Sequence, residues 1–209
     1  MAQLLRSLPK IIEDNMTRWK TSDEFPGSIS LPFGIKTSHT WHEIGQILRI
    51  INDLDITTFV ELGTHVGGLA SMISCVGKYK YFRYYGLDIK TDWADSDVLP
   101  LLLERDVLSE STKQEIEMLP RIGRTMIYCD GGNKITEMDF YASILISGDV
   151  IACHDYYNGQ DVVDLDNFGV DDTCSCVPEV REKDLVLFEN WERLPNYLLK
   201  GTRITGYIR

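Results

Sequence analysis

The sequence predicts an α/β fold in which a mostly parallel sheet is covered on both faces by helices. Three observations predict it. Short apolar, β-branched segments alternate with segments whose apolar residues recur at helical spacing, as in successive βαβ units. A glycine-bearing turn stands where the first of these strands changes into a helix. Four strand-like segments are followed by an acid, and the carboxyl ends of parallel strands meet at one edge of a sheet.

Composition limits the class of protein. The chain has 209 residues, of which 44% are hydrophobic, and this suits one domain with a sizeable core. Its net charge of −11 argues against a nucleic-acid backbone as the main partner. The five cysteines are odd in number and three lie in predicted apolar elements, which predicts reduced thiols in a cytoplasmic protein. Cys174 and Cys176 lack a second pair of metal ligands, so these cysteines are not expected to bind zinc. No apolar window approaches the ~18 residues of a membrane span, so we expect no membrane partner.

The first 39 residues are expected to form an arm and a connection. Residues 4–16 carry apolar residues at helical spacing, interrupted at Pro9, and their apolar face is a candidate homo-oligomer contact. Residues 21–39 are rich in Ser, Gly and Pro, which predicts an irregular connection. Thr40 and Glu43 then form a capping box before a helix with apolar residues up to position 51.

Within residues 58–70 the spacing of apolar residues changes from that of a strand to that of a helix. Phe59 and Val60 end an apolar run that predicts a buried strand, whereas Leu69, Met72 and Ile73 recur at helical spacing. The turn between them contains Glu61, Gly63, Gly67 and Gly68.

The spacing in this turn indicates which ligand suits it. A pyrophosphate-binding turn reads G-x-G-x-x-G, whereas this one reads E-x-G-x-x-x-G-G and lacks the second glycine. The carboxylate of Glu61 would also repel a pyrophosphate. A ligand with a cationic or hydroxyl-rich part fits better, and a tight turn with glycines for packing alone is the alternative.

The second strand is expected over residues 81–88 and ends in Asp88, 25 residues beyond Gly63. An acid at the tip of the second strand of a βαβ unit is placed to accept hydrogen bonds from the two hydroxyls of a ribose. The alternative is a solvated surface aspartate.

The remaining segments continue the alternation. An apolar run at 99–104 precedes Asp106, and Ser111 is expected to cap a short helix closed by Pro120. A fourth strand at 124–130 ends in Asp130. A helix capped by Asn133 and a fifth strand at 148–156, ending in His154 and Asp155, are expected next. The acidic residues 157–177 fit either a solvated connection or a substrate lid. A helix starting at Pro178 and closing strands at 185–191 and 202–208 are expected to complete the chain.

Four motifs carry a resemblance to a known family: Val60–Gly68, Gly86–Asp88, Asp130–Lys134 and Gly148–Tyr156. Together they resemble the class I S-adenosylmethionine-dependent methyltransferases, and more narrowly the small group of macrocin-type O-methyltransferases and cephalosporin-hydroxylase-like proteins. The resemblance covers residues 40–156. It implies a Rossmann-like, doubly wound, mostly parallel seven-stranded sheet, with residues 40–209 as the single catalytic domain.

The resemblance also implies where S-adenosylmethionine would bind. The methionine part would lie against Glu61, Gly63, Thr64 and Gly67, with the acid near the ammonium group. Asp88 would hold the ribose hydroxyls. Ile89 and Val107 would sandwich the adenine, Asp106 would lie by its amino group, and Asp130 would lie near the sulfonium methyl.

For the reacting edge the resemblance leaves two mechanisms open. Metal-dependent relatives hold a divalent ion, typically Mg2+, with acids that Asp130 and Asp155 match. This chain departs from them because His154 stands where a second adjacent oxygen ligand is usual. His154 is therefore a candidate general base, oriented by Asp130 or Asp155, and Lys134 is a candidate catalytic residue near the acceptor. We expect His65 to line the turn and His39 and His42 to be structural.

The function predicted on these grounds is O-methylation of a small molecule or a sugar hydroxyl. The alternative keeps the fold and the cofactor but not the reaction, as a cofactor- or partner-binding module with a degraded catalytic edge. A nicotinamide-dependent oxidoreductase is disfavoured by the glycine spacing. Nucleic-acid methylation is disfavoured by the acidic charge and by the lack of an Asn/Asp-Pro-Pro-aromatic motif.

Overall fold

The computed structural model describes residues 29–30, 36–37, 39–74, 81–92, 94, 96–157, 179–200 and 202–209. The predicted helix within residues 4–16 and residues 158–177 of the predicted loop lie outside this part of the chain.

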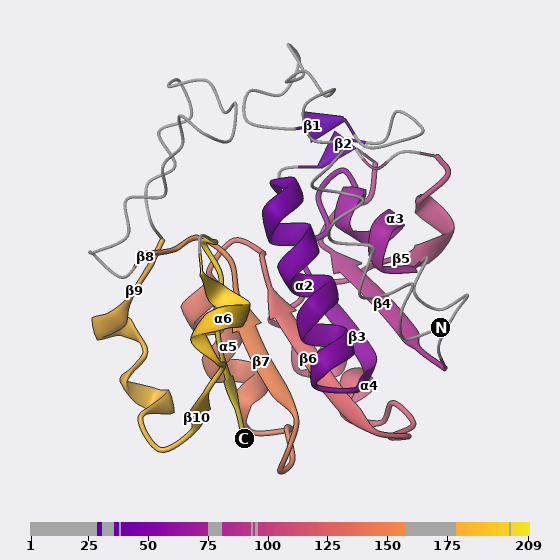
Figure 1. The fold of residues 1–209 in the computed structure, drawn as a ribbon. Helices are drawn as coiled ribbons and strands as arrows, with labels where there is room; N and C mark the ends of the chain where they lie inside the picture. The colour runs from indigo at the N-terminus through magenta and orange to yellow at the C-terminus, as the bar shows by residue number, and fades with distance from the viewer. Residues whose placement is uncertain are drawn as a thin grey trace.

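The centre of the molecule is a seven-stranded sheet in the order β10-β11-β7-β6-β3-β4-β5 (Figure 1). Neighbouring strands from β7 to β5 are parallel, whereas β11 is antiparallel to β7 and to β10. This confirms the predicted mostly parallel sheet. The strands are β3 (Ile56–Leu62), β4 (Arg83–Asp88), β5 (Leu102–Glu104), β6 (Arg124–Cys129), β7 (Val150–Cys153), β10 (Glu192–Arg193) and β11 (Thr205–Ile208).

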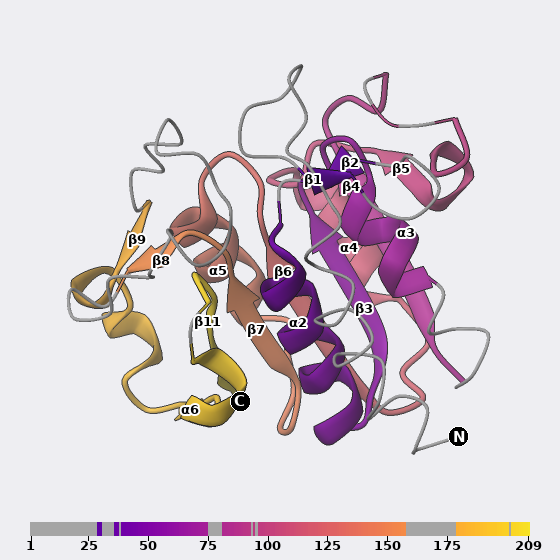
Figure 2. The same cartoon turned by 45° about the horizontal axis from the view of Figure 1, so that its top comes forward.

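Helices cover both faces of the sheet, as predicted (Figures 1 and 2). On one face, α2 (Trp41–Asp53), α3 (Gly68–Ser74) and α6 (Asn196–Leu199) pack with strand residues such as Phe59 and Tyr128. On the other, α4 (Glu110–Glu117) and α5 (Lys134–Ala142) pack with Val60 and Ile127. Successive strand residues face opposite layers, so apolar side chains at consecutive positions of β3 and β6 fill two cores.

Capping side chains set where the helices begin. Thr40 and Glu43 form the predicted capping box of α2: the backbone N–H of Thr40 donates to Glu43 Oε2 at 2.8 Å, and that of Glu43 donates to Thr40 Oγ1 at 3.2 Å. Asn133 caps α5 as predicted. The cap of α4 is Ser109 rather than the predicted Ser111, because the Ser109 hydroxyl accepts from the backbone N–H of Thr112 at 3.2 Å.

Two apolar segments for which strands were predicted contain 3₁₀ helix instead. Residues 185–191 include η6 (Val186–Phe188), in which Leu185 and Phe188 are buried and the residues between them are exposed, a period of three instead of two. The run at 99–104 begins with η3 (Leu99–Leu101), which has Pro100 in its first turn, and only Leu102–Glu104 pairs as β5.

The remaining short elements lie outside the main sheet. The predicted helix at Pro178 is instead strand β9 (Val180–Arg181) followed by η5 (Glu182–Asp184), and β9 pairs with β8 (Tyr156–Tyr157). Within the connection predicted to be irregular, β1 (Ile29–Ser30) pairs with β2 (Lys36–Thr37). Among the described residues, every helix is too short or too polar to span a lipid bilayer.

Candidate functional site

The turns that follow β3, β4, β6 and β7 lie side by side at the carboxyl edge of the sheet. Backbone hydrogen bonds join them: Gly63 donates to Leu87 O at 2.8 Å, Asp130 donates to Leu62 O at 2.8 Å, and His154 donates to Cys129 O at 3.1 Å. The predicted row of acids therefore lies along one edge. Ligands of open α/β sheets bind at this edge, where the strand order reverses between β3 and β6.

The turn after β3 needs glycine at two positions. Gly63 has φ +84°, and a Cβ there would lie 2.5 Å from Gly131 Cα and 2.6 Å from Asp130 O. Gly67 has φ +83°, and its Cβ would lie 2.7 Å from Val98 Cγ1. Only glycine adopts this left-handed conformation without strain. The turns after β3 and β6 are thus in direct backbone contact, which brings the first acid of the row close to Asp130.

Glu61 is a buried carboxylate at the end of β3. It is 1% exposed, and the Tyr84 hydroxyl donates to its Oε2 at 2.5 Å. Burial raises the pKa of Glu61 well above its ordinary value; the Tyr84 bond opposes this rise, and the charges of Asp130 and Asp88 add to it. In the part of the chain that the structure describes, Glu61 forms no ion pair. A cationic group beside it would therefore be stabilised.

Two further groups beside the turn have capacity to accept or donate hydrogen bonds. Asp88 Oδ2 accepts from the backbone N–H of His65 at 2.8 Å and Oδ1 from that of Lys90 at 3.3 Å, and a carboxylate has lone pairs for two more donors. Thr64 Oγ1 is buried and has no hydrogen-bond partner among the described residues. A buried hydroxyl without a partner is unfavourable, so this atom marks a place where a ligand group would be favoured.

The predicted adenine-binding residues follow the next two strands. Ile89 is 66% exposed beyond β4, which leaves an apolar side chain uncovered at the edge. Val107 is half-buried, and its carbonyl accepts from the Tyr141 hydroxyl at 2.5 Å. Asp106 is exposed, and its Oδ1 accepts from the backbone N–H of Leu108 at 3.0 Å.

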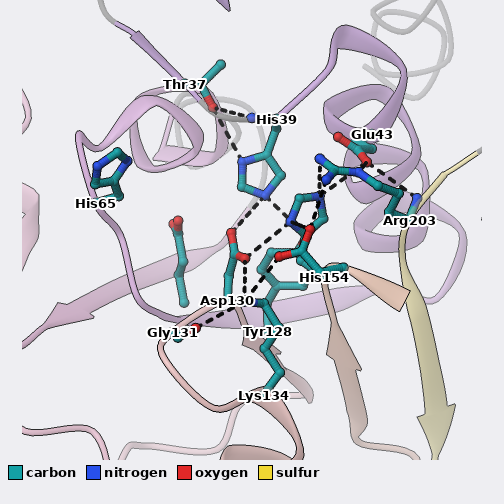
Figure 3. Close-up of polar contacts among 12 residues, drawn as sticks. Thr37, His39, Glu43, His65, Tyr128, Asp130, Gly131, Lys134, His154 and Arg203 are labelled. Atoms are coloured by element: carbon teal, nitrogen blue, oxygen red, sulfur yellow. Dashed lines mark hydrogen bonds and ion pairs between the residues drawn. The ribbon is translucent and has the colours of Figure 1, made fainter. Parts of the chain in front are cut away.

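The turns after β6 and β7 hold a group of charged side chains that we term the charged cluster (Figure 3). Its members are His39, Glu43, Asp130, Lys134, His154, Asp155, Glu179 and Arg203. Three predicted catalytic residues meet here: His154 Nδ1 lies 3.3 Å from Asp130 Oδ1, and Lys134 Nζ lies 3.8 Å from the same oxygen.

The predicted metal ligand Asp155 lies within the same cluster, with positively charged partners on both oxygens. Its Oδ1 accepts from Arg203 Nη1 at 2.9 Å and lies 3.3 Å from His154 Nδ1. Its Oδ2 lies 3.2 Å from Lys134 Nζ, which also donates to Glu179 Oε2 at 2.7 Å. Lys134 therefore neutralises carboxylates from three different segments.

His154 is held as a cation. Its Nδ1 faces Asp130 and Asp155, and its Nε2 lies 3.2 Å from Oε1 of Glu43, which is 2% exposed. Burial alone would lower the pKa of His154, but the charges of Asp130 and Glu43 and the hydrogen bonds of Asp130 and Asp155 raise it well above its usual range. The same pairing lowers the pKa of Asp155 to about 2 against the opposing effect of burial. A general base that is neutral near pH 7 does not fit this arrangement.

Four members of the cluster, His39, Glu43, Glu179 and Arg203, were missed from the sequence or given another role. His39 was expected to be structural, yet its Nε2 lies 3.1 Å from Asp130 Oδ2. Glu43 was read only as a capping residue, although its Oε1 accepts from Arg203 Nε at 3.2 Å. The only sequence signal for His39 was its place four positions before Glu43, just ahead of the Thr40 cap of α2. Nothing in the sequence pointed to Arg203. His65 lies apart from the rings of His39 and His154 (Figure 3).

Comparison with known proteins supports the fold. No family model matches the sequence, and no curated protein sequence does. Among solved structures, a Staphylococcus aureus protein assigned as a caffeoyl-CoA O-methyltransferase matches with a TM-score of 0.51 and 11% identity, covering 100% of this chain and 92% of its own. A Thermobifida fusca protein assigned as a methyltransferase matches with a TM-score of 0.50 and 13% identity over 80% and 78% of the two chains. The apo structure of CmcI-N160 matches with 0.50 and 12% over 79% and 71%. The chain therefore has the fold of class I methyltransferases, as the motifs predicted.

Proposed function

We propose that the protein is an S-adenosylmethionine-dependent methyltransferase that acts on a hydroxyl oxygen of a small molecule or a sugar. The observation that carries this proposal is the Glu61 carboxylate, buried at the glycine turn and without an ion-pair partner in the described chain. A buried charge with no counter-charge is unfavourable. The ammonium group of the cofactor would supply that counter-charge at the place where the methyltransferase fold binds it.

The other residues at the turn also suit this cofactor. Thr64 offers an unpartnered buried hydroxyl, and the bare backbone at Gly63 and Gly67 permits close approach. Asp88 has free lone pairs for the ribose hydroxyls. Ile89 and Val107 offer apolar surface for the adenine, with Asp106 near its amino group.

The bound cofactor supplies a methyl group on a positively charged sulfur, which is already activated toward an oxygen nucleophile. The protein then has to align the acceptor hydroxyl, let its proton leave and stabilise the charge that develops on its oxygen. Lys134 and the imidazolium of His154 provide fixed positive charge beside Asp130, so we assign them electrostatic roles. Against the opposing effect of burial, the pKa values of Asp130 and Asp155 are both lowered by their cationic neighbours, so neither carboxylate suits proton removal, and the proton of the acceptor hydroxyl would pass to solvent.

Magnesium does not suit the residues present. Mg2+ prefers six oxygen ligands and binds through carboxylates that are free to approach it. Both oxygens of Asp155 are paired with cationic groups, and the ammonium of Lys134 lies between Asp155 and Asp130, 3.2 Å from one and 3.8 Å from the other. The proposed reaction therefore uses no magnesium.

A second candidate function is a cofactor-binding protein without turnover. It is favoured by the internal pairing of the charged cluster, in which Asp130 and Asp155 are both already neutralised by neighbours. One methylated product from a panel of hydroxylated small molecules would exclude it, whereas cofactor binding without any product would support it.

Cofactor binding is tested by thermal unfolding. S-adenosylmethionine and its demethylated product should each raise the melting temperature of the wild-type protein. Asp88→Ala removes a charge-assisted contact worth about 1.5–3 kcal/mol and should weaken binding roughly 10- to 150-fold. Asp53→Ala, an exposed position at the end of α2, is the matched control and should keep the full shift. If neither ligand stabilises the wild type, the proposal fails.

A further inference from the structure

Two histidines in the charged cluster direct ring nitrogens at one carboxylate. His39 Nε2 lies 3.1 Å from Asp130 Oδ2, and His154 Nδ1 lies 3.3 Å from Asp130 Oδ1. One ligand atom from each of these three residues lies within 4.8 Å of the others, and the two ring centroids are 4.7 Å apart. Figure 3 shows the rings of His39 and His154 side by side, both directed at Asp130.

The separations suit a common metal ion. Zinc binds nitrogen and oxygen ligands at about 2.0–2.2 Å, so two ligands of one ion lie about 3.0–3.5 Å apart at angles between octahedral and tetrahedral. The two nitrogen-to-oxygen distances at Asp130 fall within this range. His39 and His154 would exchange their hydrogen bonds to Asp130 for bonds to the ion. Asp155 is not a candidate for a fourth ligand, because Arg203 Nη1 and Lys134 Nζ already lie against its two oxygens.

The far nitrogen of each ring also has a partner, as in histidines that bind metals. Such histidines usually direct their second nitrogen at a carboxylate or another fixed oxygen, which orients the ring and sets its tautomer. His154 Nε2 lies 3.2 Å from the buried carboxylate of Glu43, with Arg203 Nη2 at 3.3 Å, and His39 Nδ1 lies 3.4 Å from Thr37 Oγ1. On the inner side, His39 Nε2 also contacts the Tyr128 hydroxyl at 3.2 Å.

The charged cluster has more negative than positive charges, so a divalent cation could balance it. It contains two permanently charged cations, Lys134 and Arg203. Its four carboxylates are Glu43, Asp130, Asp155 and Glu179. Four negative charges less two positive charges leave two negative charges. One divalent ion at Asp130 would neutralise these two charges.

We propose that His39, Asp130 and His154 bind a divalent transition metal of the zinc class. Two imidazoles and one carboxylate suit Zn2+, Fe2+, Co2+ or Ni2+, whereas Mg2+ and Ca2+ prefer oxygen alone. The site differs from the predicted pair Asp130 and Asp155 in both its ligands and its metal. Binding displaces ring protons, and the bound ion would present positive charge at the reacting edge. The inference concerns metal binding alone and holds whether or not the protein transfers methyl groups.

Cobalt is the probe for this site because its visible absorption bands report nitrogen and oxygen ligands directly. Full-length protein stripped with a chelator should bind one Co2+ per chain and show these bands, which Zn2+ should abolish and a large molar excess of Mg2+ should not. His39→Ala should weaken Co2+ binding by roughly 100-fold or more. Thr37→Val removes the outer partner of the His39 ring, together with the hydroxyl that accepts from the His39 backbone N–H, and should weaken binding by roughly 10-fold. His42→Ala is the matched control, because His42 lies on α2 with its Nε2 against Lys200 O, and it should bind as the wild type does.

Folding of each variant is checked by circular dichroism, and Thr37→Val keeps the test decisive if the loss of a buried histidine unfolds the protein. The proposal is overturned if wild-type protein gives no cobalt bands, if folded His39→Ala or Thr37→Val binds as tightly as wild type, or if Mg2+ displaces Co2+ as readily as Zn2+ does. The thermal shift with S-adenosylmethionine, measured on metal-free protein, reports the proposed function separately. The protein could bind cobalt without being stabilised by S-adenosylmethionine, or the reverse, so the two proposals are tested independently.

Discussion

Replacing Gly63 by alanine is expected to force apart the turns after β3 and β6. The left-handed conformation at φ +84° costs a non-glycine residue about 1–2 kcal/mol. The new Cβ would also lie 2.5 Å from Gly131 Cα and 2.6 Å from Asp130 O, and these backbone atoms cannot rotate away as a side chain can. Overpacking of this kind adds about 1–3 kcal/mol. The total loss is roughly 2–5 kcal/mol, or roughly 4–20 °C in melting temperature for a domain of this size.

Urea and thermal unfolding of Gly63→Ala measure this loss. Gly132→Ala is the matched control in the neighbouring turn, because a Cβ there would meet nothing within 4 Å and Gly132 does not have positive φ. It should stay within about 0.5 kcal/mol of wild type. Gly63→Ala should also lose stabilisation by S-adenosylmethionine. A Gly63→Ala protein as stable as Gly132→Ala would refute the close contact between the two turns.

Further predictions concern the buried side chains of Glu61, Asp149, Cys129 and Cys153. Glu61→Gln should stabilise the ligand-free protein increasingly as pH rises above the ordinary glutamate value of 4.5, because the raised pKa of Glu61 makes its ionisation costly; urea unfolding at several pH values measures this. The same variant should bind the cofactor roughly 10- to 150-fold more weakly by calorimetry. Asp149→Asn should lose about 3–5 kcal/mol in urea unfolding, because Asp149 is 1% exposed and accepts from Arg121 Nη1 at 2.6 Å; a loss below about 1 kcal/mol would contradict this. Cys129 and Cys153 are buried with raised pKa, so mass spectrometry should find them modified by a thiol reagent only as the protein unfolds, and rapid native labelling would count against this.

The sheet and its acidic edge were predictable because both depend on local sequence. The period of apolar residues distinguishes strand from helix, and parallel strands necessarily end at one edge. Glu61, Asp88 and Asp130 therefore came together as expected. Residues 185–191 were misread because a short apolar run fits a strand and a 3₁₀ turn equally well until the burial of each side chain is known.

The charged cluster was predictable only in part. Asp130, His154 and Asp155 follow adjacent strands, so their proximity follows from the topology. Glu43 and Arg203 are separated by 160 positions, and their contact depends on how α2 and the approach to β11 pack over the sheet end. No spacing in a single sequence encodes such a contact. The sequence also could not decide whether the site binds magnesium, or whether His154 is a neutral base or a cation. Both depend on which side chains contact the carboxylates of Asp130 and Asp155.

The position of Arg203 in the chain has a consequence for synthesis. Glu43 and Asp155 are translated well before Arg203, which lies just ahead of β11, the strand that pairs with β7. Until residues 203–208 leave the ribosome, closing the earlier strands would bury carboxylates that still lack this guanidinium. An unfinished chain is therefore biased against premature closure, and the edge where a ligand would bind is completed only after β11 has been synthesised.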